Sequence, residues 1–214
     1  MTIILLAGLV LSMGCEPPAS QRSPELQDEI ASREIKKIPE GTIMAKAGEL
    51  GEQLAAKTQA TLAENLKQAL KDSGVKGAIE FCNVQAYPLV DSIEKNMDIS
   101  IRRTSLRIRN AQNTPNDLEA RILEAYQYNF ENDQELTDNL QKIDDEYLLY
   151  TKPIVISNAV CLNCHGQVGQ QVTEDVNHLL KSLYPEDHAT GFKKGDLRGM
   201  WSIKIARKAV ISQL

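Results

Sequence analysis

An excess of positive charge is absent from this chain of 214 residues, whose net charge is −5 and whose isoelectric point is near 5.3. Nucleic-acid binding depends on gathered Lys and Arg side chains, so we expect no nucleic-acid partner. Potential metal ligands are also few, because the chain has only three histidines and four cysteines, and each can be weighed separately. The 42 % of hydrophobic residues suffices for the core of one globular domain.

The N-terminus lacks an apolar run long enough to cross a bilayer as a helix, since residues 1–14 are apolar but too short. They lead directly into Gly14 and Cys15, which resembles a lipobox, where a signal peptide is cut before a cysteine that becomes lipidated. We expect residues 1–14 to be a signal peptide and Cys15 to anchor the protein in a membrane, on the periplasmic side or at the cell surface. No Lys or Arg precedes the run and Ser12 departs from the usual pattern, so an uncleaved or truncated N-terminus is the alternative.

Residues 15–41 are polar and proline-containing after Cys15 and lack a sustained apolar face, which is typical of a flexible linker. Residues 42–214 are expected to form the folded domain. Apolar positions recur at helical spacing from Ile43 to Leu70, with Ser73-Gly74 as a stop signal, and a second helical pattern starts at Gly77 and includes Cys82. A third helix is expected after Thr114 as N-cap.

Strands are indicated at three places. Leu106 and Ile108 alternate with arginines, residues 147–156 are rich in strand-forming side chains, and apolar residues alternate with polar ones over 201–205. The sequence therefore predicts an α+β fold in which a small antiparallel sheet is flanked by helices, the first of them long.

The stretch CLNCH, residues 161–165, has the spacing of a c-type haem attachment site. Cys161 and Cys164 would bond covalently to the haem vinyl groups, and His165 would be an iron ligand. A structural disulfide, a thioredoxin-like redox pair and half of a zinc site are the alternatives. The redox pair expects a strand–helix context that is not found, and zinc commonly needs a second Cys/His pair. We therefore expect one covalently attached haem c.

Cys82 is the cysteine left over once Cys15 is assigned to lipid and the CLNCH pair to haem. A leftover thiol is unusual in an exported protein unless it is buried or bound. Cys82 either fills the core as a small apolar side chain or binds the second face of the iron. The sequence pattern by itself supports both options equally. Other candidates for that face are His178, His188, Met97 and Met200.

Arginines are concentrated just before the third helix, at positions 102, 103, 107 and 109. Haem propionates are carboxylates that arginine holds by paired hydrogen bonds, so Arg107 and Arg109 are candidate propionate contacts. Their alternation with apolar residues also fits a solvated strand face.

Four ordered blocks resemble a known family of exported c-type haem proteins with a PAS-like domain: IEFCNVQA, RRTSLRIRNAQNTPNDLE, TKPIVISNAVCLNCHG and YPEDHATGFKKGDLRGMWSIKI. The resemblance covers residues 43–206. It implies a PAS-like fold and His/Cys haem ligation, with His165 as the proximal ligand and Cys82 as the distal thiolate. The family also occurs as the sensor part of signalling proteins, and it often has Lys where this chain has His188.

Three functions follow from these expectations. The first is a membrane-tethered electron-transfer protein, and the second is a redox or gas sensor in which reduction weakens the Cys82 bond. With no effector domain in the sequence, a sensor would signal through a partner protein. A haem enzyme such as a peroxidase ranks last, because it needs a distal acid–base group and no motif supports His178 or His188 in that role.

Overall fold

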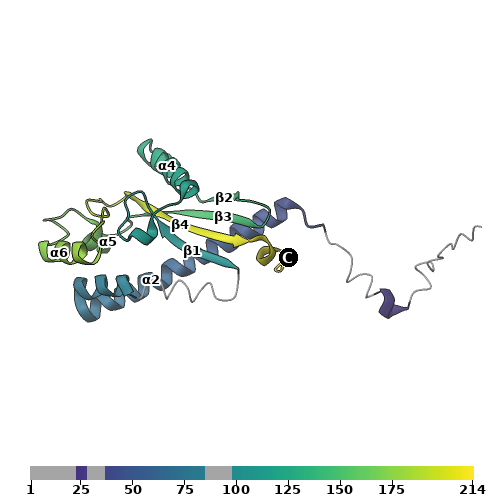
Figure 1. Ribbon diagram of the computed structural model, residues 1–214, viewed down its shortest axis with the longest axis horizontal. Coiled ribbons are helices and arrows are strands. Elements are labelled where there is room, and N and C mark those ends of the chain that lie inside the picture. Colours follow the sequence, from purple (N-terminus) through teal and green to yellow (C-terminus); the bar gives the residue numbers. More distant parts are fainter. Residues whose placement is uncertain (1–22, 28–36, 85–97) are drawn as a thin grey trace, which may run out of the picture. The chain divides into compact units, whose positions relative to one another are not determined.

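The computed structural model describes residues 23–27, 37–84 and 98–214, which Figure 1 draws as ribbon. The chain divides into two compact units, Met1–Lys37 and Ile38–Leu214. In the first unit, residues 24–27 form one helical turn. The expected signal peptide, Cys15 and most of the expected linker lie outside the described residues. No helix within the described part of the chain is long and apolar enough to span a bilayer.

The second unit contains a four-stranded antiparallel sheet in the order β1-β4-β3-β2. This sheet and its helices confirm the expected α+β class. The elements in chain order are α2 (Glu40–Val84), β1 (Ile99–Thr104), the 3₁₀ turn η2 (Ala111–Asn113), α4 (Asp117–Glu131), β2 (Asn139–Lys142), β3 (Tyr147–Val155), α5 (Ala159–His165), α6 (Glu174–Leu183), β4 (Leu197–Ala206) and α7 (Arg207–Ile211).

The long helix α2 has one buried stripe, as its sequence period predicts. Ile43, Ala47, Leu50 and Leu54 are all less than one tenth exposed. The expected stop at Gly74 is a kink, since this residue has φ 64° and ψ −166° and the helix resumes directly after it. A positive φ favours glycine because it lacks a Cβ. The kink divides α2 into a long part along the sheet and a short second part that carries Cys82.

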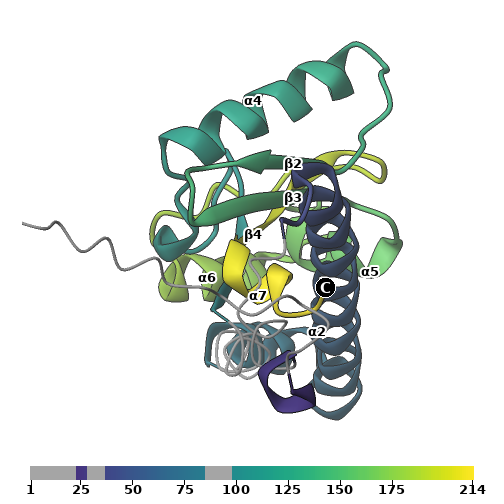
Figure 2. The ribbon, with the colours of Figure 1, turned by 90° about the vertical axis from the view of Figure 1, so that its right-hand side faces the viewer.

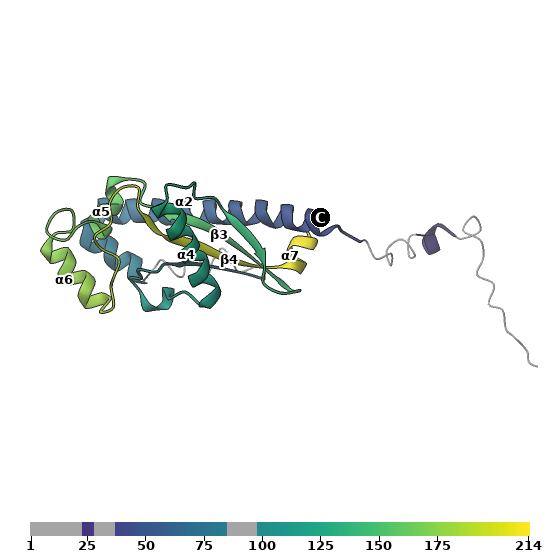
Figure 3. The ribbon, with the colours of Figure 1, turned by 90° about the horizontal axis from the view of Figure 1, so that it is seen from above.

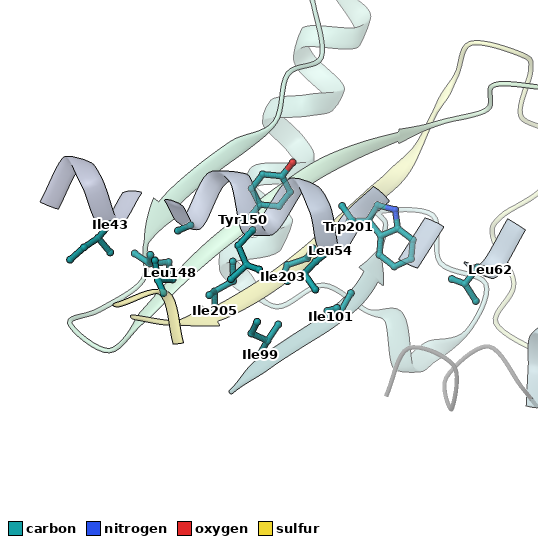
Figure 4. Close-up of a cluster of buried hydrophobic side chains, with 14 residues drawn as sticks. Ile43, Leu54, Leu62, Ile99, Ile101, Leu148, Tyr150, Trp201, Ile203 and Ile205 are labelled. Carbon is teal, nitrogen blue, oxygen red and sulfur yellow. The ribbon is translucent and has the colours of Figure 1, made fainter. Parts of the chain in front are cut away.

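The sheet lies between two helical layers, with α2 on one face and α4 on the other (Figure 1; Figure 2). Successive strand residues point to opposite faces, so Leu148 and Tyr150 contact the α2 side while Leu149 contacts the α4 side. Figure 4 shows the α2-side cluster, in which side chains from α2, β1, β3 and β4 meet. At Gly51 the helix approaches so closely that an added Cβ would lie 2.3 Å from the Tyr150 ring.

Two local expectations are wrong. The Leu–Arg alternation at 106–109 does not form a strand, because β1 ends at Thr104 and the Ser105 hydroxyl accepts a hydrogen bond from the Arg107 backbone N–H at 3.0 Å. The third helix is capped by Asn116 rather than Thr114. Asn116 accepts bonds from two backbone N–H groups, and the Glu119 carboxylate accepts one from the Asn116 N–H at 2.9 Å, which completes a capping box.

Candidate functional site

A cavity of about 1020 Å³ lies where the later part of α2 meets α5, α6 and the neighbouring ends of β1, β3 and β4. Figure 3 shows α5 and α6 together at one end of the sheet, with α7 at the other. Helix α2 supplies the largest share of the wall, mostly with apolar side chains, and β3 and α5 supply much of the rest. The three described cysteines, Cys82, Cys161 and Cys164, all contribute to it, as does His165. The cavity thus brings together four residues that the sequence singled out.

Helix α5 presents the two motif cysteines. Asn158 caps it, because its side-chain oxygen accepts hydrogen bonds from the backbone N–H groups of Val160 and Cys161. Residues three apart on a helix share a face, so Cys161 and Cys164 point to the same side. Both are free thiols, and burial raises the pKa of Cys164 to about 11. Across the described residues, no group of three or more His, Cys, Asp or Glu side chains could hold a metal ion.

The ring of His165 is held in one orientation by the loop that follows α6. Its Nδ1 lies 2.7 Å from the Ala189 carbonyl oxygen. Because a carbonyl only accepts, this contact requires the proton on Nδ1 and leaves the Nε2 lone pair free. Arg198 Nε also lies 3.3 Å from Nδ1, but a protonated Nδ1 cannot accept from it, so the carbonyl contact is the one that decides the tautomer.

The charge state of His165 agrees with this tautomer. Burial is the largest cause that holds its pKa well below the usual value, followed by the positive charges of Arg198 and Arg109. A neutral imidazole with a fixed tautomer is the form that binds a metal through its second nitrogen. The arrangement therefore offers one nitrogen donor toward the cavity.

Cys82 lies about two helical turns beyond the Gly74 kink, on the second part of α2. It is half-buried and lines the cavity. Burial raises the pKa of the Cys82 thiol, although the positive charges of Arg103 and Arg109 act in the opposite direction. The structure thus places Cys82 on the wall that also carries the CLNCH residues. Its role as an iron ligand stays a prediction.

The other candidates for a second ligand lie elsewhere. His178 and His188 are exposed and are absent from the described cavity wall. Met200 is fully buried in the cluster between the sheet and α4. Met97 falls outside the described residues. Of the candidates that the structure describes, Cys82 alone lines the cavity.

Arg107 and Arg109 both hold the loop after α6. Arg107 donates to the carbonyls of His188 and Thr190 and is absent from the described cavity wall. Arg109 lines the cavity, but its Nη2 donates to the carbonyls of Cys164 and Ala189 at 2.5 and 3.1 Å. Propionate binding by these two arginines stays a prediction.

Two further arginines line the cavity, Arg103 and Arg198, and the sequence analysis did not single them out as site residues. The pKa of Arg198 is lowered to about 9, chiefly by burial and then by the nearby positive charges of Arg109 and Arg103. Arg103 stood in the same arginine block as the two predicted contacts, whereas nothing near Arg198 in the sequence distinguishes it from a surface charge.

These residues fit a covalently bound tetrapyrrole. The cavity is at the upper end of the range for ligand pockets, and its walls combine apolar surface with a few polar groups. Two thiols on one helical face and an adjacent imidazole with a free nitrogen are the groups that hold a c-type haem, and a third thiol is a donor that binds haem iron in other proteins. The cationic groups suit its carboxylates.

Comparisons with known proteins agree on the kind of domain. No curated protein is significantly similar to the chain. Among solved structures, it is similar to the one described as the crystal structure of the cyanobacterial heme-protein Tll0287, with 23 % identity and a TM-score of 0.52 over 86 % of this chain and 97 % of that one. At this identity the likeness shows a shared fold. The model of the Tll0287-like family matches residues 36–206, and the chain therefore belongs to the Tll0287-like family.

Proposed function

We propose that this protein binds one haem covalently through Cys161 and Cys164, with His165 on one face of the iron and Cys82 on the other. The observation that carries the proposal is that one cavity is lined by all four of these residues, although Cys82 is about eighty positions distant in the chain. Membership of a family named after a haem protein supports it.

Each residue has a separate task in this proposal. The capped helix α5 holds the two thiols on one side, and the Ala189 carbonyl fixes the His165 ring so that Nε2 faces the cavity. A bound haem iron supplies a one-electron redox couple. A thiolate at Cys82 favours the ferric state and lowers the reduction potential, whereas methionine would raise it.

We infer electron transfer or redox sensing as the biological task, in an exported protein tethered to a membrane through lipidated Cys15. The apolar stretch 1–14 before Cys15 supports the tether. The partner would be a redox or signalling protein. An enzymatic role is less supported, because His165 is the only one of the three histidines on the described cavity wall, which leaves no histidine there as distal acid or base.

Sensing has one specific observation in its favour. Cys82 lies on the short part of α2 beyond the Gly74 kink, so a change in its bond would act on a segment that joins the sheet-bound part through a glycine. Glycine at a positive φ is a common pivot in a backbone. Loss of the Cys82 bond on reduction would then change the position of this segment.

Haem attachment is tested by producing the protein with cytochrome c maturation machinery and measuring its intact mass. We expect the mass of one haem to be added to the wild type and to be lost in the Cys161→Ala/Cys164→Ala double variant. Cys15→Ser is the matched cysteine control. This variant should still carry the haem, but it should no longer be found in the membrane fraction because it cannot be lipidated. An unmodified wild-type mass would refute covalent attachment.

The ligand role of Cys82 is tested by optical and EPR spectra of the ferric, ferrous and CO-treated forms. Low-spin thiolate features should be present in the wild type and in Cys15→Ser and should vanish in Cys82→Ala. CO binding by the ferrous wild type would favour sensing, whereas a closed ferrous site would favour electron transfer. Unchanged spectra in Cys82→Ala would show that this residue is no ligand.

A further inference from the structure

Three guanidinium groups line the cavity, and one described carboxylate accompanies them. Arg109 Nε lies 3.2 Å from Asp187 Oδ1, and both side chains are largely buried, with exposed fractions of 13 % and 4 %. Arg103 and Arg198 also line the cavity, and neither has an ion pair with any described residue. Three positive charges therefore share one described carboxylate, since Asp187 is paired with Arg109 and its charge also acts on Arg198. Charge in such a place is costly unless an anion accompanies it.

Arg198 has unused hydrogen-bonding capacity on the cavity side. Its Nη1 donates to the Arg107 carbonyl at 3.1 Å, while its Nε is aimed at a His165 nitrogen that already donates to another carbonyl. Its Nη2 makes no hydrogen bond within the described residues. A guanidinium is a planar fork with five N–H donors, and its strongest complement is a carboxylate that accepts from two of them.

Arg103 has a similar position on the neighbouring strand. It stands opposite Trp201 in the pairing of β1 with β4, and its guanidinium carbon lies 5.7 Å from the centre of the Trp201 ring. This cation–π contact leaves its N–H groups free of protein acceptors among the described residues. Trp201 itself lines the cavity, so the stacking holds the Arg103 charge at the wall.

Arg107 and Arg109 are engaged differently. Arg107 donates to two carbonyls of the loop after α6. Arg109 Nη2 donates to one carbonyl of that loop and one of α5, whereas its buried Nε lies beside Asp187 and has no hydrogen-bond partner among the described residues. Their contacts explain how the loop that orients His165 is held in place. Arg107 is absent from the described cavity wall, and the charge of Arg109 is paired with Asp187, whereas Arg103 and Arg198 line the wall without an ion-pair partner among the described residues.

We propose that Arg103 and Arg198 bind the two carboxylates of the tetrapyrrole and so fix its orientation in the cavity, while Arg107 and Arg109 hold the protein loop behind His165. This inference rests on the haem binding proposed above. It assigns to Arg103 and Arg198 the role of positioning residues for a dianionic cofactor.

The test measures the propionate bending band in resonance Raman spectra, together with the reduction potential, on purified haem-loaded protein. Arg103→Met and Arg198→Met should each shift the band to lower frequency, because a carboxylate loses hydrogen bonds, and should each lower the potential, because a positive charge near the iron is removed. Arg121→Met is the control for charge alone, since Arg121 is exposed on α4.

The outcomes separate this inference from haem binding itself. If haem is attached but the band in both Met variants matches that of Arg121→Met, the assignment is wrong while haem binding stands. If the propionate band shifts in Arg107→Met instead, Arg107 is the propionate contact and the assignment to Arg103 and Arg198 is wrong. If a Met variant does not accumulate, the Lys variant at the same position keeps the charge and loses the paired donors, so its band should still shift. A wild type without haem would overturn both proposals.

Discussion

Asp187 is the residue whose replacement tests most directly how the loop behind His165 is held. Its Oδ1 lies 3.2 Å from Arg109 Nε and accepts a hydrogen bond from the Ala189 backbone N–H at 2.8 Å. The carbonyl of the same Ala189 accepts the His165 proton. Asp187→Ala removes the carboxylate and leaves the Arg109 charge buried near the other cavity arginines.

The expected loss follows from burial. Removing one partner of a buried ion pair costs about 3–5 kcal/mol because the other charge is left uncompensated. Arg109 keeps two carbonyl acceptors, so we expect the lower end, about 3 kcal/mol. In a domain of this size each kcal/mol lowers the melting temperature by about 2–4 °C, which gives a fall of about 6–12 °C.

Thermal and urea unfolding followed by circular dichroism measure this loss. Asp187→Asn should lose less than Asp187→Ala, because the amide oxygen still accepts from the Ala189 N–H. The control is Asp145→Ala, which removes a shorter ion pair to Lys142 of 2.6 Å in which the Asp145 side chain is 97 % exposed. We expect no measurable loss there. Equal losses for the two alanine variants would refute the argument that burial gives the Asp187 pair its strength.

Three other substitutions test the fold. Gly51→Val should cost about 1–3 kcal/mol in urea unfolding, because its side chain would overlap the Tyr150 ring, and an unchanged midpoint would contradict the close helix–sheet contact. Glu119→Ala should cost about 3 kcal/mol by the same assay, because it removes the acceptor of the buried Ser202 hydroxyl, the ion-pair partner of the partly exposed Arg102 and the capping-box carboxylate of α4. Glu40 has its pKa lowered from 4.5 by Arg207, so Glu40→Gln should lower the melting temperature at neutral pH, and this difference should fade as the pH falls below 4.5; a pH-independent difference would count against the pair.

Much of the architecture could be predicted because it depends on local patterns. The apolar period of residues 43–62 determines which side of α2 meets the sheet, and the alternation in residues 201–205 determines the two faces of β4. The glycine at position 74 indicated the break in α2. These signals depend only on residues that are close in the sequence, so the sequence alone predicts the elements and their buried faces.

Other features could not be predicted because distant contacts decide them. The stretch 106–109 has the alternation of a strand, yet the Ile108 carbonyl accepts from the His188 N–H at 2.8 Å, a partner eighty residues away. Asn116 prevails over Thr114 as cap because Glu119, three residues later, completes the reciprocal bond. Arg198 was overlooked since its place beside the CLNCH motif follows from a tertiary contact, in which its Nε lies 3.3 Å from Nδ1 of His165.

The site was predictable to the extent that it is encoded in one short motif. The CLNCH spacing singled out Cys161, Cys164 and His165, and all three line one cavity, while their bonds to a haem stay a prediction. Cys82 came from counting cysteines and from a resemblance, and its presence on the same wall depends on how the second part of α2 lies against α6. The spacing of apolar residues in the sequence does not predict where this part of α2 lies relative to α6.

The cavity wall includes side chains from several hydrophobic clusters, two of which lie on different parts of α2. Leu62 and Trp201 are part of the cluster between α2 and the sheet, whereas Leu180 and Tyr184 are part of the cluster between α2 and α6, and all four line the cavity. A group held there touches both clusters at once, and separate regions of a protein open independently only while little joins them. We therefore expect that a cofactor bound in the cavity joins the sheet and the α6 region into one cooperative unfolding unit, which slower amide hydrogen exchange in α6 would report.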